Sequence, residues 1–190
     1  MPTESPARDD EAPSTSEWLV LVYRIPSEPT RLRATVWRRL KALGAIYLQN
    51  SVAALPKSLA SERALRKLRH EILEMSGTAS LLRSSVLVGE SSILDTYQAA
   101  RTDEYDEIVD RCNGFLAEIE KEYTKNHFTY AELEENEVDH TKLVNWLEKV
   151  RSRDVFDAPG RSLAEESLKK CSHALEDYAA RVYAEEPEGH

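Results

Sequence analysis

The stretch from Trp18 to Pro56 constrains the fold of this chain more than any other part of it. It begins with the continuously apolar segment Trp18–Tyr23, which is typical of a central strand buried on both faces. Two prolines end that strand, and Thr30 is a suitable N-cap for a helix after them. The start of the stretch therefore predicts a strand followed by a helix.

The predicted helix is amphipathic and strongly basic. Its apolar stripe consists of Leu32, Val36, Trp37, Leu40 and Leu43, spaced as on one face of a helix. Gly44 suits the position after the last turn. Residues 45–48 and 52–55 then predict two short strands, joined as a hairpin around residues 49–51.

A second helix is predicted from about Leu59 to Met75, and a further strand lies within Thr78–Val88. The apolar residues of that strand are Leu81, Leu82, Val86 and Val88. The resulting order β-α-β-β-α-β is the ferredoxin-like arrangement. A winged helix is the alternative interpretation of the helix and hairpin.

After Gly89 the apolar residues recur with a helical period to the end of the chain. Helices are predicted over 103–123 and 137–150, and a last one follows the loop 151–160, capped by Ser162. In the middle helix the residues expected to face inward are Val138, Leu143, Trp146, Leu147 and Val150. Three such helices should pack as a small bundle.

The predicted fold class is therefore α+β: a ferredoxin-like domain followed by a helical, three-helix domain. The expected boundaries are a disordered tail over 1–16, the ferredoxin-like domain over 17–90 and the helical domain over 91–185. The tail is assigned from its Pro, Ser and acidic residues.

Charge is distributed unevenly between these parts. Residues 17–75 carry 11 Lys/Arg against 5 Asp/Glu, whereas residues 76–190 carry 13 against 25. The formal net charge of -9 speaks against a protein that coats nucleic acid without specificity. The basic first part nevertheless indicates a local binding face.

Other features narrow the class of protein. Cys112 and Cys171 lie in apolar phases of helices and are predicted to be buried free thiols in a reducing cytoplasm. No apolar run approaches the roughly 18 residues of a membrane helix, and the first 16 residues lack the apolar region of a signal peptide. No catalytic triad order or glycine-rich phosphate loop occurs. We therefore expect a cytoplasmic protein that is not an enzyme, with no cofactor, no metal and no membrane partner.

Several long motifs of this chain together resemble a known family. They are Trp18 with its apolar strand and Arg24-Ile25-Pro26, Val36–Ala45, Val52–Pro56, Phe128–Glu137 and Arg151–Phe156. These motifs resemble the N-terminal region of the ChrB family over about residues 18–184. ChrB proteins are associated with bacterial chromate resistance and act as chromate-responsive transcriptional regulators.

The resemblance implies a regulator in chromate resistance that binds DNA without catalysis. Full-length ChrB proteins have a further C-terminal domain, which this chain is too short to include. A separate protein of the ChrB C-terminal type is therefore an expected candidate partner, and a homodimer is expected as well.

The strand-helix-hairpin part also resembles the central domain of PaaX-type repressors and the CRISPR-associated endonucleases that share the ferredoxin-like fold. Those nucleases use an acidic residue near the end of the first strand. Here that position offers Tyr23-Arg24-Ile25-Pro26, and metal-dependent phosphodiester cleavage needs carboxylates to hold the cation. A metal-dependent nuclease is thus the least favoured of the alternatives.

The candidate DNA-binding residues are the cations of the basic half. They are Arg24, Arg31, Arg33, Arg38, Arg39, Lys41, Arg66 and Lys67, with Arg63 and Arg69 beside them on the second helix. Each cation that neutralises a phosphate releases counterions. Alternatively, these side chains pair with the acidic helical half of the same chain. Both interpretations stay open at this point.

Three further clusters have weaker functional interpretations. The acidic run over 132–140 is interpreted as a solvated helix start, with binding of a hard cation by its carboxylates as the alternative. The His and Cys residues lack zinc-site spacing. Arg151 and Arg153 are candidates for binding an oxyanion such as chromate, with helix C-terminal cations as the alternative. If the chain does not bind DNA, a protein-interaction module that partners a separate sensor or transporter component is the other function to consider.

Overall fold

The computed structural model describes residues 17–185, and its chain forms two compact units that divide between Ile93 and Leu94. The boundary expected from the sequence, between residues 90 and 91, lies just before this division. The expectation of a disordered tail over residues 1–16 concerns positions outside the described residues.

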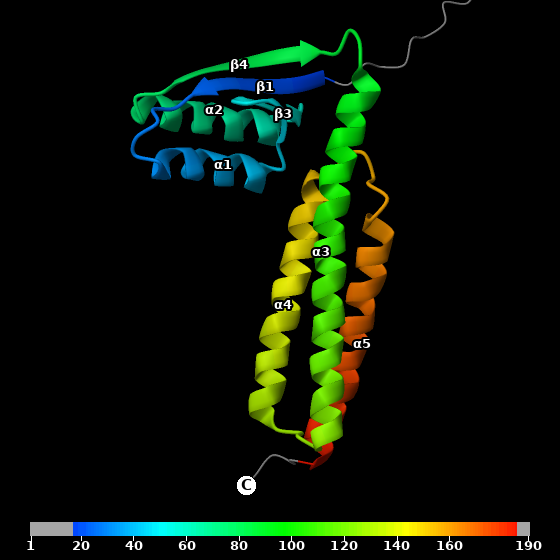
Figure 1. Ribbon diagram of the computed structural model, residues 1–190. Coiled ribbons are helices and arrows are strands. Elements are labelled where there is room, and N and C mark those ends of the chain that lie inside the picture. The colour runs from blue at the N-terminus through cyan, green and yellow to red at the C-terminus, as the bar shows by residue number, and fades with distance from the viewer. Residues whose placement is uncertain (1–16, 186–190) are drawn as a thin grey trace, which may run out of the picture. The chain divides into compact units, whose positions relative to one another are not determined.

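The first unit contains four strands and two helices. In chain order they are β1 (Glu17–Arg24), α1 (Arg31–Leu43), β2 (Ile46–Gln49), β3 (Val52–Pro56), α2 (Leu59–Glu74) and β4 (Thr78–Ser85). The sheet order is β2-β3-β1-β4, and all neighbouring strands are antiparallel. Both helices lie on the same side of the sheet (Figure 1). The predicted ferredoxin-like arrangement is confirmed.

The core of this unit lies between the sheet and its two helices. Leu19 and Leu21 of β1 pack there with Val36 and Leu40 of α1 and Ile72 of α2. Successive residues of a strand point to opposite faces, so the alternate residues of β1 point away from this core. The end of that other face is open, because the side chain of Val22 is 41% exposed. The prediction that the first strand is buried on both faces is therefore correct only in part.

The ends of α1 agree with the sequence in position but differ in detail. Gly44 follows the helix with φ 79°, a left-handed conformation that glycine adopts without steric cost. Thr30 is the residue before the helix, but its side chain makes no capping hydrogen bond. Val88, expected inside the last strand, lies beyond β4 and is almost fully exposed.

The prediction that Trp37 faces inward is wrong. Its side chain is 50% exposed. Val36 and Leu40 already fill the face of α1 that contacts the sheet, and Trp37 is turned about 100° from Val36 around the helix axis. The indole instead lies under a cation, with Lys41 Nζ 5.4 Å from the ring centroid.

The second unit is a bundle of three helices, α3 (Glu90–Lys125), α4 (Tyr130–Arg153) and α5 (Arg161–Glu185). One apolar core joins them, and it includes the buried free thiols of Cys112 and Cys171, as predicted. Among the described residues, no helix is both long enough and apolar enough to cross a membrane.

The first two of these helices are longer than the sequence indicated. The first begins at Glu90 rather than near 103, and the second begins at Tyr130 rather than near 137. Val138, expected to face inward, is exposed, whereas Leu133 and Asn136 are buried. Ser162 lies inside α5 rather than at its cap. The apolar residues over 137–150 span too few helical turns to determine the phase of α4.

Candidate nucleic-acid interface

Helix α1 is the most cationic element of the structure's first unit. Its 13 residues include five Arg or Lys side chains and no carboxylate. Since each residue of a helix is rotated by about 100° from the last, these cations fall on three sides of it. Arg31 and Arg38 point away from the face that packs on the sheet, and Arg39 lies on the flank towards α2, where it meets Glu71.

The other flank of α1 borders a groove of about 530 Å³. Its lining residues are Tyr23, Arg24, Ile25, Arg33, Trp37, Tyr47, Asn50 and Ser51. They come from the end of β1, from α1 and from the β2–β3 hairpin. The groove therefore combines aromatic rings, two guanidinium groups and a side-chain amide.

Several contacts fix the shape of this groove. The hydroxyl oxygens of Tyr23 and Tyr47 lie 3.1 Å apart within hydrogen-bonding range. The backbone N–H of Tyr23 donates to the Ser51 carbonyl over 3.0 Å, which ties the hairpin turn to the end of β1. Burial, together with the neighbouring Tyr23, raises the pKa of Tyr47, so the Tyr47 hydroxyl stays protonated at neutral pH.

Arg33 is positioned at the edge of the groove by a bond to the chain. Its Nη2 donates to the Ser27 carbonyl oxygen over 2.9 Å. This contact uses one of the five N–H donors of a guanidinium group, so the remaining donors and the full charge are available to a ligand. Arg33, Trp37 and Lys41 follow one another at intervals of four residues and so lie along one side of α1.

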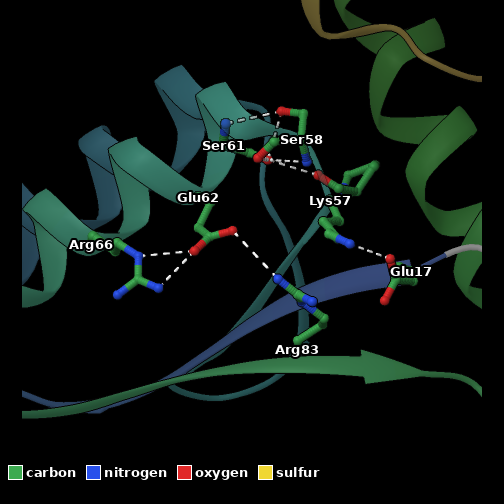
Figure 2. A network of polar contacts seen from close by, with 8 residues as sticks. Glu17, Lys57, Ser58, Ser61, Glu62, Arg66 and Arg83 are labelled. Atoms are coloured by element: carbon green, nitrogen blue, oxygen red, sulfur yellow. Dashed lines mark hydrogen bonds and ion pairs between the residues drawn. The ribbon is translucent and has the colours of Figure 1, made fainter.

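Helix α2 differs in part, because one of its cations, Arg66, meets a carboxylate of the same unit. Figure 2 shows Glu62 between two arginines. Arg66 donates to Glu62 Oε1 from Nε over 3.0 Å and from Nη2 over 2.7 Å, and Arg83 of β4 lies 3.9 Å from Glu62 Oε2. Lys57 pairs with Glu17 close by. The pKa of Glu62 is lowered, chiefly by the hydrogen bond from Arg66, so these charges compensate one another at neutral pH.

The predicted DNA-binding residues thus separate into two groups. Those with a carboxylate partner are Arg39, which lies 3.3 Å from Glu71, and Arg66. Those without an ion pair inside residues 17–93 are Arg24, Arg31, Arg33, Arg38, Lys41 and Lys67. All but Lys67 lie on α1 or at the end of β1. We call these five cations the α1 face.

The predicted oxyanion residues have carboxylate neighbours in the helical unit. Arg151 Nε lies 3.1 Å from Glu165, and its Nη1 lies 3.4 Å from Glu148. Arg153 Nη2 lies 2.5 Å from Glu104 Oε1. Oxyanion binding by Arg151 and Arg153 stays a prediction, and an anion would compete there with carboxylates already in place.

Sequence reasoning missed the aromatic part of the groove. The sequence predicts Tyr23 in a buried strand, Trp37 in the core, and Tyr47 and Asn50 only in the hairpin. One signal was available: Trp37 stands four residues from both Arg33 and Lys41. A tryptophan in a cationic stripe is better suited to the surface than to the core.

The fold and the site define a chain with a ferredoxin-like unit, a cationic helix face beside an aromatic groove, and a three-helix bundle. The family model described as "Protein ChrB, N-terminal" matches residues 33–189. The chain belongs to this family, which is related to chromate resistance and its regulation. Among curated proteins, no sequence matches the chain.

Proposed function

We propose that this protein is a DNA-binding regulator of chromate resistance, which binds DNA through the α1 face and the adjoining groove without catalysis. One observation carries the proposal: α1 has five cations and no carboxylate, and four of the five have no ion pair inside residues 17–93. Several unneutralised guanidinium and ammonium groups on one exposed helix are what a phosphate backbone recognises.

The groove supports a role beyond phosphate contact. Trp37 and Tyr47 are partly exposed, and both line it with Arg33 and Asn50. Arginine and asparagine side chains form bidentate hydrogen bonds with guanine and adenine edges, respectively. Aromatic rings stack on bases that leave the helix. We propose that the α1 face contacts the backbone and that groove residues contribute sequence preference.

The test is an equilibrium titration of the full chain with fluorescently labelled DNA. The DNA should be the segment upstream of its own gene, compared with a scrambled duplex of equal length and composition. We expect preferential binding of the upstream segment at low salt and no cleavage of either DNA in the presence of Mg²⁺.

Two other results would replace the proposal. Absence of binding at low salt, together with co-purification of a neighbouring gene product, would favour the protein-interaction module. Cation-dependent cleavage would favour a nuclease. A homodimer stays a prediction, and sedimentation with and without DNA measures it in the same samples.

A further inference from the structure

A cluster of three potential metal ligands lies at the corner between α3 and α4, far from the residues of the proposed DNA interface in sequence. Glu122 is in the last turn of α3, His127 is in the connection, and Glu132 is in the first turn of α4. One ligand atom from each residue lies within 4.8 Å of the other two. These atoms are two carboxylate oxygens and one imidazole nitrogen.

The distances suit a small cation. His127 Nδ1 lies 2.7 Å from Glu122 Oε2 and 3.7 Å from Glu132 Oε1. Ligand atoms around a tetrahedral ion with bonds of about 2.0–2.2 Å are roughly 3.3–3.6 Å apart. The two distances fall on either side of that range, so adjustments of well under an ångström in side-chain position would complete the geometry for these pairs.

An ordinary ion pair explains only part of this arrangement. Nδ1 of an imidazole carries at most one proton and forms one strong hydrogen bond, which Glu122 accepts. Glu132 approaches the same nitrogen and brings a second negative charge within 4.8 Å of the first. Like charges at that spacing repel one another, and Lys125, 3.1 Å from Glu122 Oε1, supplies one compensating charge. One negative charge remains, and a divalent cation between the three ligands would more than offset it.

The surrounding structure holds the ligands in place. The side chain of Glu122 is only 3% exposed, and Lys125 binds its Oε1, which leaves Oε2 directed at His127. The backbone of His127 is fixed at both ends: its N–H donates to the Glu122 carbonyl over 3.0 Å, and its carbonyl accepts the Tyr178 hydroxyl over 2.7 Å. Partners of this kind orient metal ligands in known sites.

We propose that Glu122, His127 and Glu132 bind a first-row divalent transition metal, which joins the end of α3 to the start of α4. One nitrogen and two oxygens with an open fourth position suit Zn²⁺ and the other late first-row divalent metals. Ca²⁺ and Mg²⁺ prefer sites with more oxygen ligands. The site is independent of the proposed DNA binding, so either proposal can fail alone.

The test uses the untagged full chain, freed of metal with a chelator and titrated with Zn²⁺ by calorimetry at pH 7.5. Co²⁺ serves as a second probe, because its visible absorption reports four-coordination. We expect one site, a higher melting temperature with Zn²⁺, and a Co²⁺ spectrum of a four-coordinate ion.

Three variants make the result decisive. Loss of an outer partner typically lowers metal affinity 10–100-fold, so H127A should lower it by at least about 100-fold. E132Q should also weaken binding, and it changes a side chain that is 32% exposed, so the fold should persist. The matched control is H173A, which removes an exposed histidine 3.6 Å from the single carboxylate of Glu176. The proposal is overturned if the wild type binds no Zn²⁺ at millimolar concentration, or if H127A and H173A bind it equally well.

Discussion

Replacing Arg31 and Arg38 by glutamine removes the two outward cations of α1 and should flatten the salt dependence of DNA binding. Both side chains are exposed, and neither has an ion pair inside residues 17–93. Their loss should therefore leave the free energy of unfolding within about 0.5 kcal/mol of the wild-type value. Any change in binding then reports on the interface rather than on the fold.

The magnitude follows from the number of available cations. The α1 face has five, and each phosphate contact contributes about -0.9 to the slope of log K against log salt. Five contacts give a slope of about -4.5, and three give about -2.7. Between 50 and 200 mM salt the wild type should thus lose about 500-fold in affinity and the double variant only about 40-fold.

Fluorescence anisotropy with labelled duplex DNA over that salt series measures both slopes. The matched control is K149Q/K169Q, which changes the net charge from -9 to -11 as the test variant does. Its two lysines are exposed side chains of α4 and α5 without ion pairs in the described part of the chain. Equal slopes for the test variant and the wild type would refute the assignment of the α1 face. A slope change of the same size in the control would show that the effect comes from net charge and not from Arg31 and Arg38.

Three further predictions address the groove, its support and the bundle. W37A should cost about 1–3 kcal/mol in binding to single-stranded DNA if a base stacks on the indole, with little change in melting temperature; an unchanged dissociation constant would contradict stacking. G77A should lower the free energy of unfolding by roughly 1–3 kcal/mol, because the new Cβ would lie 2.5 Å from the Arg24 carbonyl oxygen. The control G114A should not lower the urea midpoint, because its new Cβ would meet no neighbouring atom within 4 Å. Acid should destabilise the bundle partly through Glu122, whose pKa in the folded chain is lowered from 4.5. The ionised carboxylate therefore stabilises the folded state above pH 4.5, and this stabilisation is lost as the pH falls through the folded pKa. The fall in melting temperature from pH 7 to pH 3 should therefore be smaller in E122Q than in the wild type.

The order of elements was predictable from sequence because it depends on local signals. The apolar run of β1, the period of α1 and the left-handed Gly44 each act over a few residues. The orientation of Trp37 was not predictable in the same way. It adjoins the apolar stripe in sequence, and only the packing of Val36 and Leu40 against the sheet determines which side of the stripe is buried.

The division of the cations into paired and unpaired groups also depends on tertiary structure. Arg39 meets Glu71 only because α1 and α2 lie on the same side of the sheet. Glu62 likewise meets Arg83, which is 21 positions away in sequence, across the first unit (Figure 2). Composition alone indicated a basic half, and only the folded unit shows that Arg39 of α1 and Arg66 of α2 have carboxylate partners.

The difference between the two helices bears on which one DNA would approach. Helix α2 follows the electrostatic rules for a helix N-terminus, with Glu62 in its first turn and a capping box at Ser58. Helix α1 violates them, since Arg31 and Arg33 occupy a first turn that contains no acid, beside the positive end of the macrodipole. Each such charge costs a few tenths of a kcal/mol or more in helix stability. A phosphate group near that turn would relieve both the repulsion among the arginines and their conflict with the dipole. Such local conflicts are expected at functional sites, and this one supports α1, rather than α2, as the face that meets an anion.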